Sequence, residues 1–382
     1  MGGTSEGFGP RGDGPSRPGS LAFVRAVCVV GARPNFMKIT PVIEALERRS
    51  AEVLLVHTGQ HYDRSMSTVF FDELGLRAPD RWLDVGSGTH AEQTAGIMTA
   101  LEPVIDDVRP DVVVVVGDVN STMAAALVAA KSPARLAHVE AGLRSRDWTM
   151  PEEVNRLVTD TVSDDLLAPS QDAVDNLLAE GHAPERIYLV GNVMIDTLLA
   201  NLERAKKGDV MARLGVAEGS YGLVTMHRPA NVDDPDMLAL LLKALGEVAT
   251  RCPLLLPVHP RVAPHMAAAY VPAGVRVIEP LGYLDFLALE AGARLVLTDS
   301  GGVQEETTAL GVPCLTLRDM TERPVTITEG TNVLVGRDPD RIIAEADRVL
   351  RDGVVPRRPA LWDGKAGERT ADVLVDEGRC RR

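Results

Sequence analysis

Residues 297–311 have the sequence LTDSGGVQEETTALG, which joins the end of an apolar strand to the start of a helix. The predicted strand ends at Thr298, and Gly301 and Gly302 open the helix that follows. Two glycines at a helix start allow backbone N–H groups to contact a phosphate directly. The segment matches neither the GxGxxG pattern of dinucleotide-binding folds nor the P-loop. It therefore predicts a phosphate-binding turn and gives no indication of NAD binding or ATP hydrolysis.

Further strand and helix patterns alternate on both sides of this segment. The second half of the chain has predicted strands at 221–226, 253–258, 275–279, 294–298, 313–318 and 332–335. Its predicted helices lie at 235–250, 283–292, 302–310 and 338–351. The first half has strands at 24–30, 52–57, 112–116, 135–139, 165–168 and 186–190, with helices at 121–131 and 170–181 among the segments between them. Such alternation predicts a parallel sheet with helices on both faces.

The whole pattern predicts an α/β protein with two Rossmann-like, doubly wound parallel-sheet domains. We predict a disordered N-terminal extension at 1–20, domains at 21–200 and 201–360, and a C-terminal helix within 361–382 that packs back on the first domain. The join near residue 200 rests on the charged segment 201–219. Ligands of open α/β sheets bind beyond the carboxyl ends of the strands, so two facing sheets predict an interdomain cleft.

Composition narrows the classes of function. The 382-residue chain carries 54 acidic and 40 basic residues, a net charge of −14, which disfavours nucleic acid and anionic membranes as partners. No apolar stretch approaches the roughly 20 residues of a membrane span. The four cysteines are scattered without metal-binding spacing, and we expect reduced, buried thiols and a cytoplasmic location. No metal-binding motif and no cofactor are predicted.

Polar residues follow two strands of the first half. Gly31 ends the first strand, and Arg33 and Lys38 come next, close to a predicted helix N-terminus that can bind an anion. Asp118 follows the five-valine strand 112–116 and faces the cleft by topology. A surface turn with two solvated cations is the alternative for the first group. For Asp118 the alternative is an N-cap of the next helix or a partner of its dipole.

The densest group of charged residues lies in the segment HVEAGLRSRDWTMPEEVNR, which begins at position 138. Glu140 directly follows an apolar strand, where a merely solvated charge is unusual. A proline predicts a helix start, which places Glu152 and Glu153 in the first turn. For Glu153 we favour stabilisation of the helix dipole. Glu152 either lines a site or pairs with Arg156, four residues later on the same helix face.

The second half offers two further strand ends. His227 and Arg228 follow the strand 221–226, and a histidine in this position is a good catalytic candidate. His259 follows the next strand and is a weaker candidate. The loop RDMTERP supplies Arg323 after a later strand, with a solvated connection as the alternative.

These segments together resemble the non-hydrolysing UDP-N-acetylglucosamine 2-epimerases over roughly residues 24–351. The matching segments are GARPNFMK (31–38), TGQHYD (58–63), GDVNST (117–122), HVEAGLR (138–144), PEEVNR (151–156), HRPANVDD (227–234), PVHPR (257–261), DSGGVQEE (299–306) and RDMTERP (318–324). The resemblance implies a GT-B arrangement of the two domains and, as is usual in that family, a homodimer. It also implies elimination of UDP across C1–C2 to give 2-acetamidoglucal, re-addition of UDP, and reprotonation of C2 on the opposite face.

The resemblance also implies roles for individual residues. Asp118 and Glu140 are expected to supply base and acid functions, supported by Glu152 and His227, and which carboxylate removes the C2 proton stays open. The substrate-binding residues implied are Arg33, Lys38, Arg156, Leu281, Phe286, Ser300, Gly301, Gly302, Glu306 and Arg323. Leu281 and Phe286 would contact the uracil, Ser300 to Gly302 the diphosphate, and Glu306 the ribose. Candidates for a second, allosteric nucleotide-sugar site are Gln60, His61, Arg228 and His259.

Several alternatives remain at this level. The chain has HRPAN where many bacterial members have HRRE, and branches of the family act on other UDP-sugars, including uronates. A hydrolysing epimerase, which releases N-acetylmannosamine and UDP, shares the fold and most of the motifs. A GT-B glycosyltransferase would use the same nucleotide cleft, and a nucleotide-sugar sensor would bind UDP without turnover. The product could serve a cell-envelope polysaccharide or a secondary metabolite.

Overall fold

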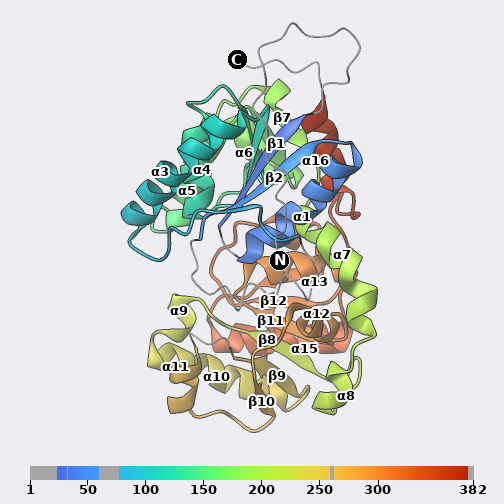
Figure 1. The fold of residues 1–382 in the computed structure, drawn as a ribbon. Helices are drawn as coiled ribbons and strands as arrows, with labels where there is room; N and C mark the ends of the chain where they lie inside the picture. The colour runs from blue at the N-terminus through green and yellow to red at the C-terminus, as the bar shows by residue number, and fades with distance from the viewer. Residues whose placement is uncertain (1–23, 32, 60–76, 259–261, 377–382) are drawn as a thin grey trace, which may run out of the picture.

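The computed structural model describes residues 24–31, 33–59, 77–258 and 262–376, and it contains two parallel β-sheets, one in each half of the chain (Figure 1). The strands of the first sheet are β1 (Arg25–Val30), β2 (Glu52–His57), β3 (Arg81–Trp82), β4 (Val112–Val116), β5 (Arg135–Val139), β6 (Asp165–Ala168) and β7 (Ile187–Leu189). Their spatial order is β3-β2-β1-β4-β5-β6-β7, so the direction of winding reverses between β1 and β4.

The second sheet repeats this plan. Its strands are β8 (Gly222–Thr225), β9 (Leu254–Pro257), β10 (Val275–Ile278), β11 (Leu295–Thr298), β12 (Cys314–Thr316) and β13 (Asn332–Leu334). Their order is β10-β9-β8-β11-β12-β13, which places the reversal between β8 and β11. The prediction of two doubly wound, Rossmann-like parallel-sheet domains is confirmed.

Helices cover both faces of each sheet (Figure 1). Those of the first half are α1 (Arg33–Arg48), α3 (His90–Val108), α4 (Asn120–Ala129), α5 (Pro151–Val162), α6 (Gln171–Ala179), the 3-10 turn Pro184–Arg186, and α7 (Val193–Lys206). The rest are α8 (Val210–Leu214), α9 (Pro229–Val232), α10 (Pro235–Ala249), α11 (Ala263–Ala268), α12 (Tyr283–Ala291), α13 (Gly301–Leu310), α14 (Val325–Thr328), α15 (Pro339–Asp352) and α16 (Ala366–Val375).

The central strands show why their sequences are aliphatic without alternation. In β1, Cys28 and Val30 belong to the core on one face of the sheet, whereas Val27 and Val29 belong to a separate core on the other face. All five valines of β4 are buried. Strands that are covered on both faces have no solvent-facing positions for polar residues, which accounts for the continuous apolar runs.

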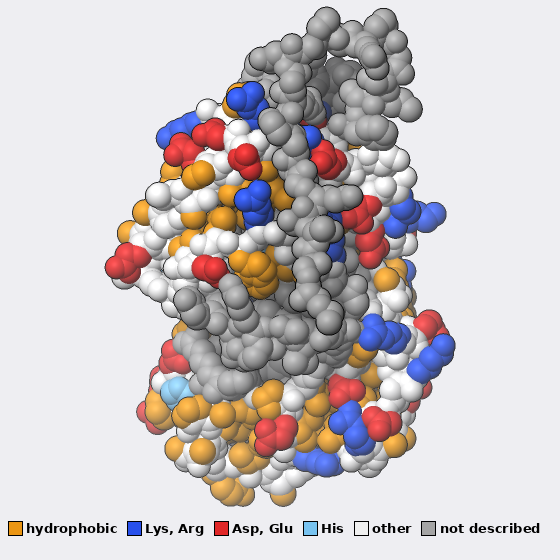
Figure 2. Space-filling model, in the orientation of Figure 1, with side chains coloured by type: hydrophobic (Ala, Val, Ile, Leu, Met, Phe, Trp, Pro, Cys, Tyr) orange, Lys and Arg blue, Asp and Glu red, His pale blue; other side chains and the backbone are white. Residues whose placement is uncertain are grey.

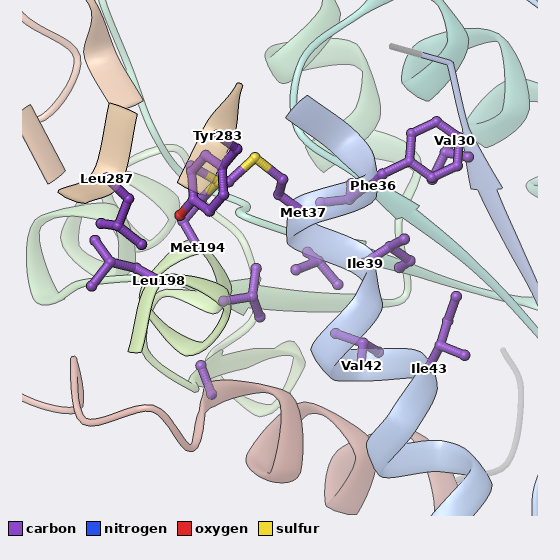
Figure 3. Close-up of a cluster of buried hydrophobic side chains, with 14 of the residues drawn as sticks. Val30, Phe36, Met37, Ile39, Val42, Ile43, Met194, Leu198, Tyr283 and Leu287 are labelled. Atoms are coloured by element: carbon purple, nitrogen blue, oxygen red, sulfur yellow. The ribbon is translucent and has the colours of Figure 1, made fainter. Parts of the chain in front are cut away.

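Helix α7 joins the two halves of the molecule. It contacts α1 of the first half and both α12 and α13 of the second. Figure 3 shows Met37 from α1, Met194 from α7 and Tyr283 from α12 meeting in one cluster of buried side chains. The chain therefore passes from the first sheet to the second inside a continuous hydrophobic core. The predicted boundary at residue 200 falls within this helix rather than in an exposed linker.

The C-terminal helix α16 returns to the first half, where it packs against α1 and α7. Its N-terminus is capped by a residue of another helix: Ala366 and Gly367 donate backbone N–H bonds of 3.1 and 2.7 Å to the buried carboxylate of Asp196 in α7. On its outer side, Arg49 pairs with Asp372 at 2.6 Å.

Acidic and basic side chains are interspersed over the described surface in Figure 2. Among the residues described, no helix has both the length and the apolar character needed to cross a bilayer. Cys28, Cys252 and Cys314 are buried free thiols, as expected, and Cys380 lies outside the described residues.

The Asp196 cap yields a test of how α16 is held. Asp196→Ala should destabilise the protein by about 0.5–2 kcal/mol, because two helix N–H groups lose their acceptor. Urea unfolding, together with hydrogen exchange of residues 366–375, measures both the global and the local effect. Asp372→Ala is the matched control, since an exposed ion pair contributes at most about 1 kcal/mol. Equal, small effects of the two variants would show that the cap does not anchor α16.

Candidate active site

A cavity of about 710 Å³ lies between the two halves of the molecule. On one side it is lined by residues that follow β1 and β4, and on the other by residues that follow β8 and β11. These are the strands between which the winding of each sheet reverses. Helices leave such a point in opposite directions and open a crevice, so two facing reversals create a shared site.

Most of the predicted site residues line this cavity. They are Lys38, Asp118, Glu152, Arg156, His227, Arg228, Leu281, Phe286, Ser300, Gly301, Gly302, Glu306 and Arg323. Glu140 is not among the lining residues. Arg33 is the first residue of α1, and the description does not extend to its side chain. Gln60, His61 and His259 lie outside the described residues.

Glu140 lies behind two cations that face the cavity. Its carboxylate pairs with Lys38 of the first half and, at 3.3 Å, with Arg323 of the second. The residue is buried and has a φ of 74°, in the left-handed region that residues other than glycine rarely adopt. Strain of this kind persists only where the surroundings enforce it, and it is frequent at functional sites. Glu140 thus connects the two halves directly beneath the cavity.

Asp118 lines the cavity and pairs with Arg156. Burial raises the pKa of the Asp118 carboxyl, but the charges of Arg156, Lys38 and Arg323 together hold that pKa below its usual range. The alternative in which Asp118 caps the next helix is wrong, because the residue at the N-cap of α4 is Val119 and no side chain caps it. Asp118 is therefore an ionised carboxylate that faces the cavity.

The two acids at the start of α5 have different environments. Glu153 is buried and accepts hydrogen bonds from the backbone N–H groups of Ser145 and Arg146, at 2.9 and 2.8 Å, so it fixes the preceding loop. It also pairs with Arg156 at 2.9 Å. The alternative i, i+4 pair between Glu152 and Arg156 is not formed among the described residues, because Asp118 and Glu153 occupy the guanidinium. Glu152 lines the cavity instead.

Arg323 is surrounded by carboxylates. Besides Glu140, it lies 2.9 Å from Glu305 and 2.5 Å from Glu322. These opposite charges outweigh burial and raise the pKa of Arg323 further above its usual range. A side chain on Gly301 would come within 2.5 Å of this guanidinium. The first glycine of the helix therefore makes room for Arg323.

The second glycine has a different environment. A Cβ on Gly302 would meet nothing nearer than Met194, at 3.7 Å, and both residues line the cavity. No side chain caps the N-terminus of α13 at Ser300. The first-turn N–H groups of this helix consequently point at open space, where the helix dipole favours an anion.

His227 is oriented by a buried carboxylate. Its Nδ1 lies 2.9 Å from Asp299, which also accepts the backbone N–H bonds of His227 and Arg228 and a 3.0 Å bond from Asn231. Burial raises the pKa of Asp299, but these hydrogen bonds together hold it below its usual range. The ionised Asp299 keeps a hydrogen on Nδ1 and fixes the plane of the imidazole.

The sequence did not reveal what surrounds Glu306. Tyr283 donates a 3.2 Å hydrogen bond to its carboxylate, and Glu290 of α12 is buried beside it. Burial raises the pKa of Glu306 to about 7, and burial next to Glu306 raises the pKa of Glu290 well above its usual range. The sequence offered one indication of this environment: the predicted helix 283–292 is largely apolar but contains Tyr283 and Glu290, which are both buried.

The described residues contain no group of three or more His, Cys, Asp and Glu side chains suited to a metal ion. The chemistry that can be assigned from these residues is anion binding at α13, opposite carboxylates and a histidine that can exchange protons.

Comparison with known proteins agrees with this geometry. The family model for UDP-N-acetylglucosamine 2-epimerase matches residues 44–375. The UDP-N-acetylglucosamine 2-epimerase of Methanocaldococcus jannaschii is 42% identical over 358 residues, covering 91% of this chain and 98% of that protein. The UDP-2,3-diacetamido-2,3-dideoxy-D-glucuronate 2-epimerase of Pseudomonas aeruginosa is 41% identical, covering 92% and 99%.

A solved structure is similar over the same length. The crystal structure of the M. jannaschii UDP-GlcNAc 2-epimerase in complex with UDP-GlcNAc and UDP superposes with a TM-score of 0.83 at 41% identity, covering 92% of this chain and 99% of that one. Family model, curated relatives and structure agree over nearly the whole chain, and this chain belongs to the UDP-N-acetylglucosamine 2-epimerase family.

Proposed function

We propose that this protein is an isomerase that interconverts UDP-GlcNAc and UDP-ManNAc by inverting C2, through elimination and re-addition of UDP. One observation carries the proposal: a single cavity places the uncapped N-terminus of α13 opposite carboxylates of the other domain. The first can bind a diphosphate and the second can move a proton at the sugar. The M. jannaschii relative, whose crystal structure contains UDP-GlcNAc and UDP, supports the same ligand class.

The elimination requires a base at C2. A carboxylate of the first domain takes the C2 proton, the electron pair of that C–H bond forms the C1=C2 double bond, and the C1–O bond breaks toward UDP. Asp118 and Glu152 line the cavity, whereas Glu140 lies behind Lys38 and Arg323. We therefore assign the direct proton transfers to Asp118 and Glu152. To Glu140 we assign the fixing of the two cations.

The leaving diphosphate gains negative charge in this step. The first-turn N–H groups of α13, His227 and Arg323 are the donors available on that side of the cavity. Re-addition reverses the step: a β-phosphate oxygen attacks C1, and a proton returns to C2 on the opposite face. No atom is gained or lost overall, so the reaction consumes no external oxidant or reductant.

The uridine end of the cavity lies in the second domain. Leu281 and Phe286 supply apolar surface for the uracil ring, and Glu306 supplies an acceptor for the ribose hydroxyls. Tyr283 holds the Glu306 carboxylate in place from α12. In this arrangement the nucleotide binds to the second domain, and the sugar lies between the two domains.

A second substrate follows from one specific similarity. The P. aeruginosa relative, named for a UDP-diacetamido-glucuronate, is about as similar to this chain as the M. jannaschii relative is. Arg228 lines the cavity, and its guanidinium can form an ion pair with the carboxylate of a uronate. The homodimer, the cytoplasmic location and the domain bounds at residues 200 and 360 remain predictions.

Proton NMR of the purified protein with UDP-GlcNAc in D2O, without added metal or NAD, tests the reaction. We expect UDP-ManNAc to appear with deuterium at C2. Free ManNAc with UDP would select the hydrolysing reaction instead. Absence of turnover with either UDP-GlcNAc or the diacetamido-glucuronate substrate would contradict the proposal.

In the same assay, Asp118→Asn should lower kcat by about 100-fold or more, the usual contribution of an acid/base group. The affinity for UDP should stay near that of the natural protein, because the nucleotide contacts lie in the other domain. Asp147→Asn is the matched control: its carboxylate bonds to Thr149 within its own loop.

Alanine substitutions at the two glycines of α13 test UDP binding and folding stability separately. Gly302→Ala puts a methyl group where the diphosphate is proposed to bind, so the Kd for UDP should rise about tenfold or more, measured by calorimetry. Its Tm should not fall, since alanine favours helix formation. Gly301→Ala should lower the Tm instead, because its Cβ would lie 2.8 Å from Glu322 and nearer still to Arg323. Unchanged UDP affinity in Gly302→Ala would place the diphosphate elsewhere.

The raised pKa of Glu306, about 7, has two opposite consequences. Above that pH the carboxylate is an acceptor for the ribose, so UDP binding should weaken as the pH falls through 7. Folding stability has the opposite dependence: between the usual pKa of 4.5 and about 7 the folded state binds more protons than the unfolded state, so stability falls as the pH rises.

Glu306→Gln removes both effects. At pH 8 the variant should unfold at a higher denaturant concentration than the natural protein, and the difference should shrink as the pH approaches 4.5. It should bind UDP more weakly at pH 8. The pH dependence of UDP binding that remains belongs to the diphosphate itself. A variant less stable than the natural protein at pH 8 would show that Glu306 is not strained by burial.

A further inference from the structure

A buried histidine below the cavity contacts an acceptor with each ring nitrogen. His138 belongs to β5 and is fully buried. Its Nδ1 lies 2.6 Å from Oδ1 of Asp160 in α5, and its Nε2 lies 2.9 Å from the carbonyl oxygen of Gly117. No step of the proposed reaction uses this residue, and the cavity does not reach it.

The partners determine where the protons are. A carbonyl oxygen only accepts, so Nε2 carries a hydrogen. The other oxygen of Asp160 accepts bonds from Arg144, at 2.6 Å, and from the backbone N–H of Gly142, at 3.1 Å, as an ionised carboxylate does. Two bare acceptors at 2.6 Å would repel each other, so a hydrogen also lies on Nδ1. Both ring nitrogens are then donors, which describes the imidazolium ion.

The surrounding charges balance such a cation. Arg144 bridges Asp160 and Glu180, with its Nε 2.8 Å from the Glu180 carboxylate. Burial raises the pKa of Asp160, but His138 and Arg144 together hold it below its usual range. Asp160 thus supplies a buried negative charge in direct contact with the His138 ring, whereas Glu180 lies at the exposed end of the network.

Titratable groups face His138 from each neighbouring element. Asp160 comes from α5, Arg144 from the loop after β5, and Glu180 and His182 from the end of α6. On the side of the cavity, Asp118 directly follows Gly117 in the turn after β4. Asp160 is the group in direct contact with the ring, and Arg144 keeps it ionised.

The second contact of His138 fixes the backbone that carries the site. Gly117 donates its N–H to Val139 of β5 at 3.1 Å and accepts the His138 bond at its carbonyl, so β5 holds both ends of this residue. Asp118 is the next residue, and its carbonyl accepts a 2.9 Å bond from Asn155. The orientation of the Asp118 carboxylate relative to the cavity therefore depends on the Gly117 peptide.

We propose that His138 is an imidazolium that donates from both ring nitrogens, and a positioning residue that sets the direction of Asp118 by holding the Gly117 carbonyl. The positioning role rests on the proposed epimerase function, whereas the protonation state does not. The ion pair with Asp160 and the bond to the Gly117 carbonyl leave no acceptor role for either ring nitrogen.

Nuclear magnetic resonance of the full chain with ¹⁵N-labelled histidine tests the protonation state. The His138 signals, identified by their loss in His138→Gln, should show hydrogens on both ring nitrogens at neutral pH. One protonated and one bare nitrogen at neutral pH would overturn the proposal, whether or not the protein is an epimerase.

Two substitutions separate positioning from general stability. The side-chain nitrogen of His138→Gln can occupy the place of Nε2 and still donate to Gly117, whereas that of His138→Asn occupies the place of Nδ1 and cannot. We expect kcat to fall about 100-fold in the Asn variant, as for a displaced catalytic group, and clearly less in the Gln variant. KM and the Kd for UDP should change little in both.

His182→Asn is the matched control, because this histidine lies near Asp160 at the edge of the network and should leave kcat unchanged. Equal losses in the Asn and Gln variants, or a folded Asn variant with full kcat, would overturn the positioning role. An inactive natural protein would contradict the proposed function alone, and the NMR spectrum would still decide the protonation state.

Discussion

The packing of α7 between the two domains is the constraint on which the site depends. Met194 of this helix lies in the same buried cluster as Met37 of α1 and Tyr283 of α12 (Figure 3). Because α7 packs against both helices in one hydrophobic core, this packing fixes how the two sheets face each other. Strand ends that belong to different sheets thereby share one cavity. Neither domain alone contains both the anion-binding helix and the carboxylates Asp118 and Glu152.

The site concentrates charges that are buried and therefore costly. Arg323 lies among Glu140, Glu305 and Glu322, and each of these ions would be unfavourable without its partners. Such a cluster contributes little to stability, but it has a defined geometry because every ion must keep its neighbours. The strained backbone of Glu140 is accommodated in the same way. Burial of these charges and the strained backbone of Glu140 lower the folding stability, but they hold the charged groups at fixed positions.

Much of this architecture could be predicted, because buried parallel strands leave a direct trace in the sequence. The aliphatic runs located the strands, and the residues at their ends located Asp118, His227 and the α13 turn. The charged segment 201–219 placed the join of the domains near residue 200, and that position lies within α7, a helix with one face buried in the core. Partners distant in sequence were not predictable. Arg156 had only a neighbour in its own helix as a candidate partner, yet it also pairs with Asp118, 38 residues earlier.

The return of the chain through α16 has a mechanical consequence. The main chain crosses between the domains once through α7 and again before α16, and the two crossings touch: Arg369 of α16 donates to the carbonyl of Val190, just before α7. Both covalent connections between the domains are therefore concentrated in one place, whereas at the cavity the pair of Glu140 and Arg323 joins the domains through side chains alone.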